Sequence, residues 1–386
     1  MRFLHTADWH IGKGLRGRSR MDEHAAALDE VARIALSAKV DAVLVAGDVF
    51  DSPAPAPEAE KLVYDFLSRL LPERTACVLI AGNHDHPKKL GALAALLEGL
   101  RIHVRSEVRS PADGGVVRLA SRDGLEEARV AVLPFVPERR VVDACLVMGP
   151  EDAWYEEYAR RIEQMLATLV KGLAPGTINL VLGHLLVDGG RRGTGERDLH
   201  LGQAYGVSPQ ALPGAAQLVA LGHLHRPQEI PAPSRTLYAG SLIELDFGER
   251  EQEKRVVVFE ARPGRPVVVE SVPVTAGRKL VEVAGTLEEL RAVAGELRDA
   301  YLRVTARADG PSPCLADQVR ELLPNALDIA LEQPARGDPP EGGQPQQRVR
   351  LEPSRLFAAY HEHRNGQAPS AELARLFEEL HEEASR

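Results

Sequence analysis

Short, β-branched apolar runs alternate with longer amphipathic stretches over much of the chain, a pattern typical of an α/β fold. The run 43–46 predicts a buried strand, and similar runs lie at 2–5, 78–81, 180–182 and 219–221. Helical spacing of apolar residues predicts helices over 21–39, over the stretch that contains Leu62 to Leu70, and over a single helix that carries Leu90, Leu93, Leu96 and Leu97.

Further short runs extend this first domain. We expect strands at 102–104, 116–119 and 129–133, a helix over 154–171, and strands at 236–239, 255–259 and 267–274. The predicted first domain therefore covers residues 1–276. Packing on their own sheet explains the apolar stripes of the two helices that flank Asn83, and a homodimer contact through their outer residues is the alternative.

A smaller alternating unit follows. Strands at 280–283, 301–306 and 326–331 alternate with helices at 287–300 and 314–323, which predicts a compact α/β domain over 277–334 without residues of obvious catalytic type. The Pro- and Gly-rich stretch 335–349 has linker composition. Residues 350–386 predict two helices, at 355–364 and 371–383, with Ser370 placed to cap the second.

The last helix has one apolar face, formed by Leu373, Leu376, Phe377 and Leu380. A similar face on the helix before it contains Leu356, Phe357 and Tyr360. Both faces need a cover. Either the pair folds back on the protein's own surface, or the linker lets it dock in a groove of another chain.

Composition sets limits on the class of protein. With 386 residues and 44% hydrophobic content, the chain can form one large core and smaller units. No apolar run is long enough for a membrane span and the chain starts with a predicted strand, so we expect a cytoplasmic protein. Three distant cysteines disfavour a disulfide framework, and a net charge of −9 disfavours binding of nucleic acid by bulk charge alone.

Polar residues with metal-binding side chains follow five of the apolar runs. They are Asp8, His10, Asp48, Asn83, His84, Asp85, His184, His223 and His225. Because parallel strands present their carboxyl ends at one edge of a sheet, we expect these groups to meet there. A mixed set of carboxylate, amide and imidazole ligands suits manganese, iron or zinc.

Seven of these groups are too many for one ion. Two ions about 3.5–4 Å apart need a shared carboxylate, and Asp48 is the natural bridge. His84 follows Asn83 in one tight loop, so we assign it to proton transfer, where it can protonate the leaving oxygen. A hydrogen bond to Asp51 could orient His84, and Asp85 is the alternative for that role.

Two basic, glycine-rich loops lie next to these groups. The first contains Lys13, Arg16, Arg18 and Arg20, and it is either a solvated loop or a phosphate contact. The second contains Arg191, Arg192 and Arg197 and follows directly after His184, so substrate contact is plausible.

Five short motifs resemble the signature blocks of the calcineurin-like metallophosphoesterases. They are Asp8-x-His10, Gly47-Asp48, Gly82-Asn83-His84-Asp85, Gly183-His184 and Gly222-His223-x-His225. The resemblance implies a two-sheet sandwich with a pair of ions at its rim. It also implies that one ion takes Asp8, His10, Asp48 and His225, and that the other takes Asp48, Asn83, His184 and His223.

Longer stretches resemble the SbcD family of bacterial nuclease subunits. They are 5–12, 46–51, 221–228 and 238–241, and the likeness extends over nearly the whole chain, including the capping domain and the C-terminal helices. One departure is Gly240-Ser241-Leu242, where the family usually has Gly-Ser-Pro. This affects the loop and not the ligands.

The second resemblance implies a manganese-dependent DNA exonuclease and endonuclease. Such an enzyme acts in DNA repair and recombination with an SbcC-type ATPase, whose coiled-coil base would bind the C-terminal helices. A dimetal phosphatase, or a phosphodiesterase acting on small or cyclic nucleotides, would share the metal site and is the alternative. A non-catalytic scaffold would normally have lost ligands, and none is missing here.

Overall fold

The structure is a computed structural model, and it describes residues 1–92, 94–137, 151–191, 193, 206–308, 314–332, 353–365 and 367–384. Leu93, Cys145 and the predicted linker 335–349 lie outside these ranges. The chain divides into two compact units, Met1–Glu332 and Gln333–Arg386.

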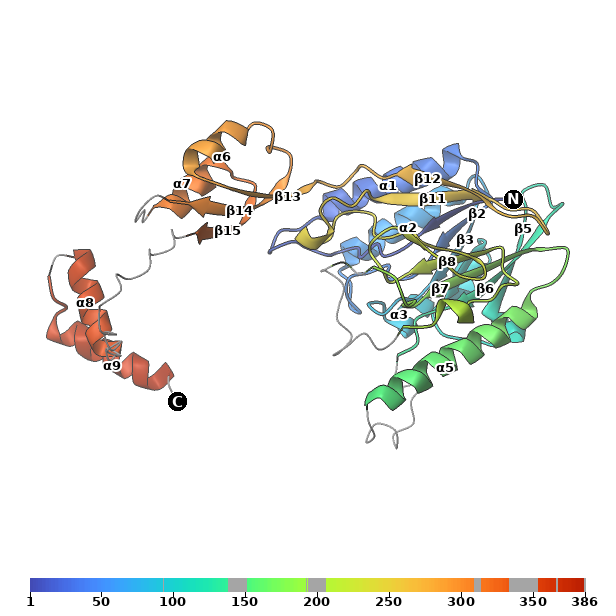
Figure 1. Ribbon diagram of the computed structural model, residues 1–386, viewed down its shortest axis with the longest axis horizontal. Helices are drawn as coiled ribbons and strands as arrows, with labels where there is room; N and C mark the ends of the chain where they lie inside the picture. Colours follow the sequence, from blue (N-terminus) through green and yellow to red (C-terminus); the bar gives the residue numbers. More distant parts are fainter. Residues whose placement is uncertain are drawn as a thin grey trace, which may run out of the picture. The chain divides into compact units, whose positions relative to one another are not determined.

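Two six-stranded sheets form the body of the first unit (Figure 1). The first sheet has the order β12-β11-β1-β2-β3-β4, with β1 (Arg2–Thr6), β2 (Ala42–Val45), β3 (Ala76–Ile80), β4 (Ile102–Arg105), β11 (Arg255–Glu260) and β12 (Val268–Pro273). The second has the order β5-β6-β7-β8-β10-β9, with β5 (Val116–Ala120), β6 (Glu127–Leu133), β7 (Ile178–His184), β8 (Leu218–Gly222), β9 (Gln228–Ile230) and β10 (Arg235–Tyr238).

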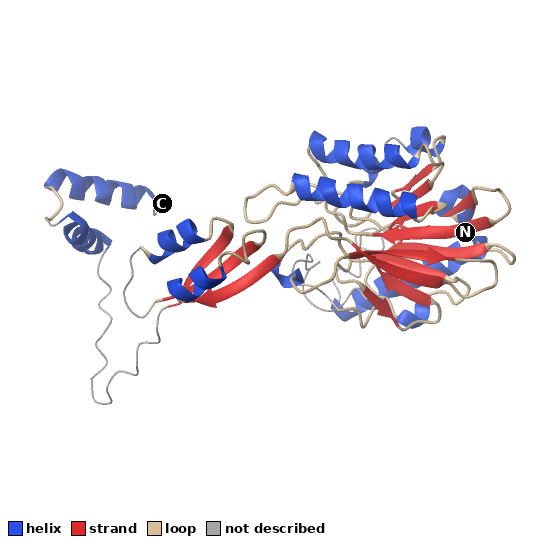
Figure 2. Ribbon diagram, turned by 90° about the horizontal axis from the view of Figure 1, so that it is seen from above, coloured by secondary structure: helices blue, strands red, loops and turns tan. Residues whose placement is uncertain are grey.

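The central strands β1, β2, β3, β7 and β8 are buried on both faces, because helices cover the outer face of each sheet (Figure 2). Phe3 and Leu44 on the inner face of the first sheet belong to the same apolar core as Leu180 of the second. Helices α1 (Met21–Ser37) and α2 (Pro57–Leu70) pack on the outer face of the first sheet, and α5 (Glu151–Leu169) packs on that of the second. The implied sandwich flanked by helices is confirmed.

Strand direction places the candidate residues. Strands β1, β2 and β3 are parallel to one another, as are β7 and β8 in the other sheet. The prediction that one sheet edge collects all the groups is therefore wrong, because two sheets contribute. His5 connects the two sheets near this end, since its Nε2 lies 3.1 Å from the carbonyl oxygen of Leu221.

Two predicted helices are shorter than expected, and a glycine lies at or just beyond the end of each. The helix expected after Asn83 consists of two pieces, α3 (Pro87–Gly91) and α4 (Ala94–Glu98), separated after Gly91. Helix α6 (Leu287–Val293) ends before Gly295 and does not reach residue 300. Glycine weakens a helix because its backbone loses most freedom on ordering. The described short helical turns are η1 (Pro111–Gly115), η4 (Val170–Gly172), η5 (Pro209–Ala211) and η6 (Phe247–Glu249).

A separate three-stranded parallel sheet completes the first unit. Its order is β13 (Leu280–Gly285), β14 (Tyr301–Arg307) and β15 (Ala326–Glu332), and α6 and α7 (Leu315–Leu322) share its apolar core. Thr286 and Glu289 form a reciprocal capping box at the start of α6. The α/β character of this smaller unit agrees with expectation, and the domain boundaries at 276 and 334 stay predictions.

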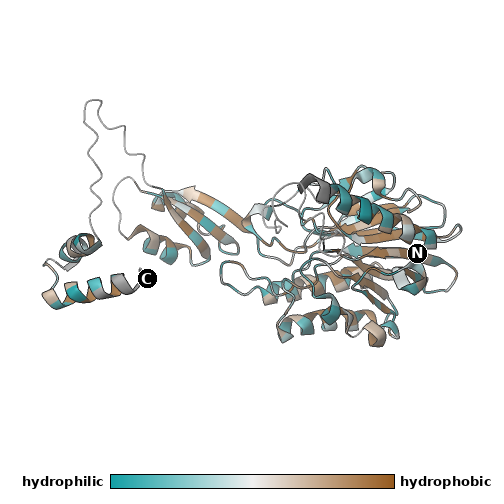
Figure 3. Ribbon diagram, turned by 90° about the horizontal axis from the view of Figure 1, so that it is seen from below, coloured by the Kyte–Doolittle hydropathy of each residue, from teal (hydrophilic) through white to brown (hydrophobic). Residues whose placement is uncertain are grey.

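The second unit contains two helices, α8 (Pro353–Asn365) and α9 (Ala371–Ala384). The amide of Leu373 donates to Ser370 Oγ at 3.3 Å, so Ser370 caps α9 as predicted. The rings of Phe357 and Phe377 stack at 4.3 Å and pack one helix on the other. Apolar and polar positions alternate along α9 (Figure 3). Among the described residues, no helix combines the length and the apolar character needed to cross a bilayer.

Candidate metal centre

The loop after β1 is fixed by a tryptophan. The side chain of Trp9 is fully buried and meets the ring of Phe66 edge-on at 5.0 Å, while its indole N–H donates to Thr6 Oγ1 at 2.8 Å. Asp8 and His10 on either side have positive φ angles of 50° and 46°. Residues other than glycine rarely adopt this backbone conformation, and it persists where the surroundings enforce it. Trp9 is the anchor, and its neighbours face the space between the sheets.

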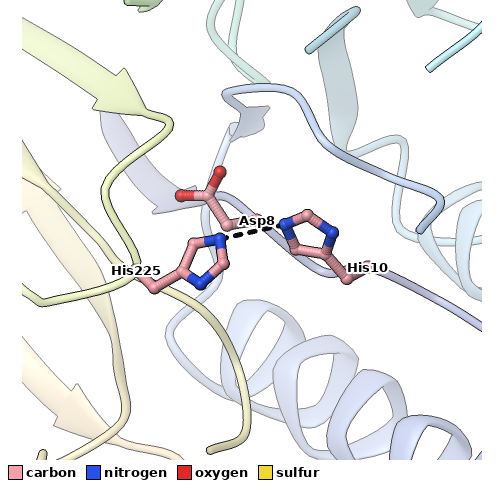
Figure 4. A group of neighbouring side chains, drawn as sticks. All are labelled: Asp8, His10 and His225. Carbon is pink, nitrogen blue, oxygen red and sulfur yellow. Dashed lines mark hydrogen bonds between the residues drawn. The ribbon is translucent and has the colours of Figure 1, made fainter. Parts of the chain in front are cut away.

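Asp8, His10 and His225 form the first cluster, in which the possible ligand atoms lie within 4.8 Å of one another (Figure 4). All three side chains are buried, and they come from the loops after β1 and β8. The Nε2 atoms of His10 and His225 are 3.1 Å apart. Two imidazole nitrogens that approach this closely are well placed to be ligands of one cation.

Asn83, His184 and His223 form the second cluster. Asn83 Oδ1 lies 2.9 Å from Nε2 of His184 and 3.0 Å from Nδ1 of His223. His184 donates its Nδ1–H to the carbonyl of Ala46 at 2.7 Å, so its Nε2 lone pair faces the cluster. An amide oxygen and two ring nitrogens therefore meet beside β3, β7 and β8.

Asp48 lies between the two clusters. Its Oδ2 atom is 3.4 Å from Nε2 of His10 and 3.6 Å from Nε2 of His184, while Oδ1 accepts the backbone N–H of His84 at 2.8 Å. Burial alone would raise the pKa of Asp48, but the neighbouring imidazoles, above all that of His184, hold this pKa well below its usual range. One anionic oxygen thus faces an imidazole of each cluster.

The protonation states suit metal ligands. Burial lowers the pKa of His10 to about 4 and also lowers that of His184, so both imidazoles are neutral at neutral pH. Neutral imidazole and ionised carboxylate are the forms that bind divalent cations. The donor set of oxygen and nitrogen without thiolate fits manganese, iron or zinc.

Two glycines permit this close approach. Gly47 has a φ of 84°, and a Cβ at this position would collide with Nδ1 of His184. A Cβ at Gly222 would overlap the carbonyl oxygen of Ala46. The Gly-Asp and Gly-His pairs of the sequence are therefore required by the distance between the two sheets at this point.

His84 and Asp51 are hydrogen-bonded, through the main chain of Asp51 and not through its carboxylate. Nδ1 of His84 donates to the main-chain carbonyl of Asp51 at 2.8 Å, while the Asp51 carboxylate is 4.0 Å away and accepts from Lys13 at 3.2 Å. The Asp85 carboxylate accepts the backbone N–H groups of Gly82, Val49 and Phe50 instead. Burial and the Asp48 carboxylate raise the pKa of Asp85 to about 7.

The first basic loop binds protein groups. Besides the contact of Lys13, Arg16 lies 3.6 Å from Asp328 and Arg18 donates to the carbonyl of Pro324, so both side chains contact the smaller α/β unit. Arg20 is only 2% exposed and forms a two-pronged ion pair with Glu23. A DNA contact by Arg20 is therefore contradicted by its burial.

The second basic loop is described only in part. The side chain of Arg191 is exposed, and its backbone N–H and carbonyl bond the side-chain amide of Gln228. Arg192 and Arg197 lie outside the described residues.

In the C-terminal helices, the exposed predicted contact residues are Leu356, Tyr360, Leu373, Leu376 and Leu380, whereas Phe357 and Phe377 are half-buried against each other.

Sequence reasoning missed a buried ion pair behind the first cluster. Nδ1 of His225 lies 2.7 Å from Oε1 of Glu249, whose other oxygen accepts from Lys254 at 2.7 Å. Both residues fall in the charged stretch 249–255, which has no apolar periodicity and is typical of a solvated loop. No local signal in the sequence marks them as buried.

Comparison with known proteins agrees with this geometry. Residues 1–227 match the family model described as calcineurin-like phosphoesterase, and residues 276–365 match that of the type 5 capsule protein repressor C-terminal domain.

Curated relatives span nearly the whole chain. The D component of the nuclease SbcCD from Bacillus subtilis (strain 168) is 33% identical over 98% of this chain and 97% of that protein. Its counterpart from Rhodobacter capsulatus is 35% identical over 93% and 94%, and that from Escherichia coli (strain K12) is 31% identical over 78% and 74%. The chain therefore belongs to the calcineurin-like phosphoesterases and, within them, to the SbcD family of nuclease components.

Proposed function

We propose that this chain is a metal-dependent DNA nuclease that hydrolyses phosphodiester bonds as the SbcD component of an SbcCD-type complex, in DNA repair and recombination. The proposal includes exonuclease action on duplex ends and endonuclease action on single-stranded or hairpin DNA. The observation that carries it is the position of Asp48 Oδ2 between an imidazole of each cluster. Family membership supports the same chemistry.

The metallophosphoesterase family and the clustered side chains support a site for two ions. We propose that Asp8, His10, Asp48 and His225 hold one and that Asp48, Asn83, His184 and His223 hold the other, with manganese as the metal. When bound, such a pair supplies an acidified water and neutralises the charge of the phosphate.

His84 is proposed to transfer the proton to the leaving oxygen. His84 is 5% exposed and its ring lies 4.5 Å from that of His10, so it borders the first cluster. The bond to the carbonyl of Asp51 occupies the Nδ1–H, so the proton that passes to the leaving oxygen must be a second one, carried on Nε2 of the doubly protonated ring. Asp51 is thus proposed to position His84 through its backbone.

The remaining proposed roles concern contacts with DNA and with partner chains. We propose that Arg191, Arg192 and Arg197 contact the phosphate backbone, and that Lys13, Arg16 and Arg18 do so only at the cost of their protein contacts. The exposed leucines of α8 and α9 are proposed to bind the SbcC-type ATPase. A homodimer through the helices around Asn83 is supported by the exposure of Tyr64 and Leu96, which are 41% and 68% exposed.

A nuclease assay tests the proposed function directly. With Mn²⁺ we expect cleavage of single-stranded, hairpin and duplex-end DNA, and little hydrolysis of a phosphomonoester or a cyclic nucleotide. Addition of EDTA should abolish cleavage, and Mn²⁺ in excess should restore it. Preferential hydrolysis of the phosphomonoester would instead favour the phosphatase alternative.

Two substitutions separate metal binding from proton transfer. Asp48→Ala should lose both ions in elemental analysis, because each ion loses a charged ligand. His84→Gln should keep both ions while turnover falls by about 10²- to 10⁴-fold, the usual range for general acid–base help. His10, Asp48 and His84 could also form a metal-binding group. Loss of an ion from His84→Gln would therefore make His84 a ligand and overturn its assignment.

Salt dependence tests the second basic loop. Replacement of Arg191, Arg192 and Arg197 by alanine should weaken DNA binding for every sequence and reduce the log–log salt slope by up to about one unit per lost phosphate contact. The control replaces the exposed Arg118, Arg262 and Arg265, which have the same charge and lie on β5 and in the loop after β11, outside the loops that carry the cluster residues. If the salt slope changes equally in the loop variant and in the control variant, the loop arginines contribute only general surface charge.

Truncation after Gln347 tests the C-terminal helices. Because they belong to a separate compact unit, the shortened chain should fold, bind metal and cut single-stranded DNA, but should no longer co-purify with the ATPase or cut duplex ends with ATP.

Point variants of the full chain refine this test. Replacement of Leu373, Leu376 and Leu380 by serine should also weaken ATPase binding, whereas replacement of the exposed Glu372 and Glu378 by serine should not. Full-strength binding by the truncated chain would place the interface elsewhere.

A further inference from the structure

The first cluster has a buried support outside the five sequence motifs. His225 Nδ1 lies 2.7 Å from Glu249 Oε1, and Glu249 itself is fully buried on η6. The second carboxylate oxygen of Glu249 lies 2.7 Å from Lys254 Nζ, 2.9 Å from Ser241 Oγ and 3.1 Å from the backbone nitrogen of Leu245. Both oxygens of this carboxylate are therefore engaged.

Lys254 closes the network. Only 4% exposed, it also lies 2.8 Å from Ser241 Oγ and 3.2 Å from the carbonyl oxygen of His225. The ammonium group thus touches Glu249 and the backbone of the histidine that Glu249 bonds. A buried ion pair gives little net stability compared with an apolar pair of the same volume, so its presence calls for another reason.

We propose that Glu249 is a positioning residue for His225 and that Lys254 fixes Glu249 in place. A carboxylate that accepts the Nδ1–H of an imidazole sets its tautomer and its ring orientation, and directs the Nε2 lone pair to the opposite side. In this structure that side faces His10 and Asp8. The inference rests on the proposed metal function of His225.

The two clusters differ in the group that accepts the Nδ1–H of their histidine. His184 in the second cluster donates its Nδ1–H to the neutral carbonyl of Ala46, whereas His225 in the first has a charged acceptor. Loss of the Glu249 carboxylate should therefore weaken the binding of the ion at the first cluster and leave the binding of the other ion unchanged. A purely structural ion pair would show no such selectivity.

The test measures Mn²⁺ binding to the full-length protein by titration calorimetry and elemental analysis. The main variant is Glu249→Gln combined with Lys254→Met, which removes both charges together so that neither is left unpaired. We expect one Mn²⁺ to bind about 10- to 100-fold more weakly, the usual effect of losing such a support, and the other to bind as in the unmodified protein.

Glu244→Gln is the matched control. Glu244 is also buried, and it pairs with Lys279 at 3.1 Å and accepts the N–H of Leu280, yet its side chain has no described contact with either cluster. The Glu244→Gln variant should bind two ions with unchanged affinity. Thermal unfolding monitors the fold of each variant, and Glu249→Gln alone serves as the second variant if the double substitution does not fold.

Three results would overturn the inference. Undiminished binding of two ions by a folded Glu249 variant removes the positioning role while leaving the proposed nuclease intact. If both ions bind equally more weakly, or if Glu244→Gln weakens Mn²⁺ binding to the same extent, the Glu249–Lys254 pair is a general structural element. If the unmodified protein binds no Mn²⁺ and cuts no DNA, the proposed function fails and this inference fails with it.

Discussion

The shared position of the Asp48 carboxylate is the constraint on which the centre depends. Asp48 comes from the first sheet and His184 from the second, so the 3.6 Å contact between them requires the two sheets to approach at this end. Glycine at 47 and 222 allows that approach, and the apolar core between the sheets maintains it. Asp8, His10, Asp48 and His223 all have positive φ angles. Each such residue costs about 1–3 kcal/mol, which only a rigid scaffold can impose.

The smaller α/β unit is connected to this centre through two segments. The loop after His10 reaches it through Arg16 and Arg18. The three-residue helix η6 carries Phe247, which packs with Leu280 and Tyr301 of that unit and lies 4.5 Å beneath the guanidinium of Arg303. Two residues later, Glu249 bonds His225. The same short helix thus contacts both the smaller α/β unit and a candidate metal ligand.

Local sequence patterns predicted what depends on local structure. The strands before Asp8, Asp48, Asn83, His184 and His223 were evident from apolar runs, and parallel strand ends placed their polar residues together. The burial of Arg20 could not be predicted, because it depends on the carbonyl of Glu244, which is 224 positions away. The same holds for Lys254, which lies in a charged stretch and is buried only because the 225 and 241 loops enclose it. Charged residues look solvated in sequence unless their distant partners are known.

The C-terminal helices bury apolar surface in a different way from the first unit. Phe357 and Phe377 use each other, and this stack fixes how α8 packs on α9. The leucines at 376 and 380 are 50% and 57% exposed, so the contact between the two helices does not cover the apolar face of α9. Helices this short depend on tertiary packing for most of their stability, and a single pair has too little core to supply it. The apolar face of α9 therefore needs a further cover beyond the contact between the two helices, as its sequence pattern also indicates.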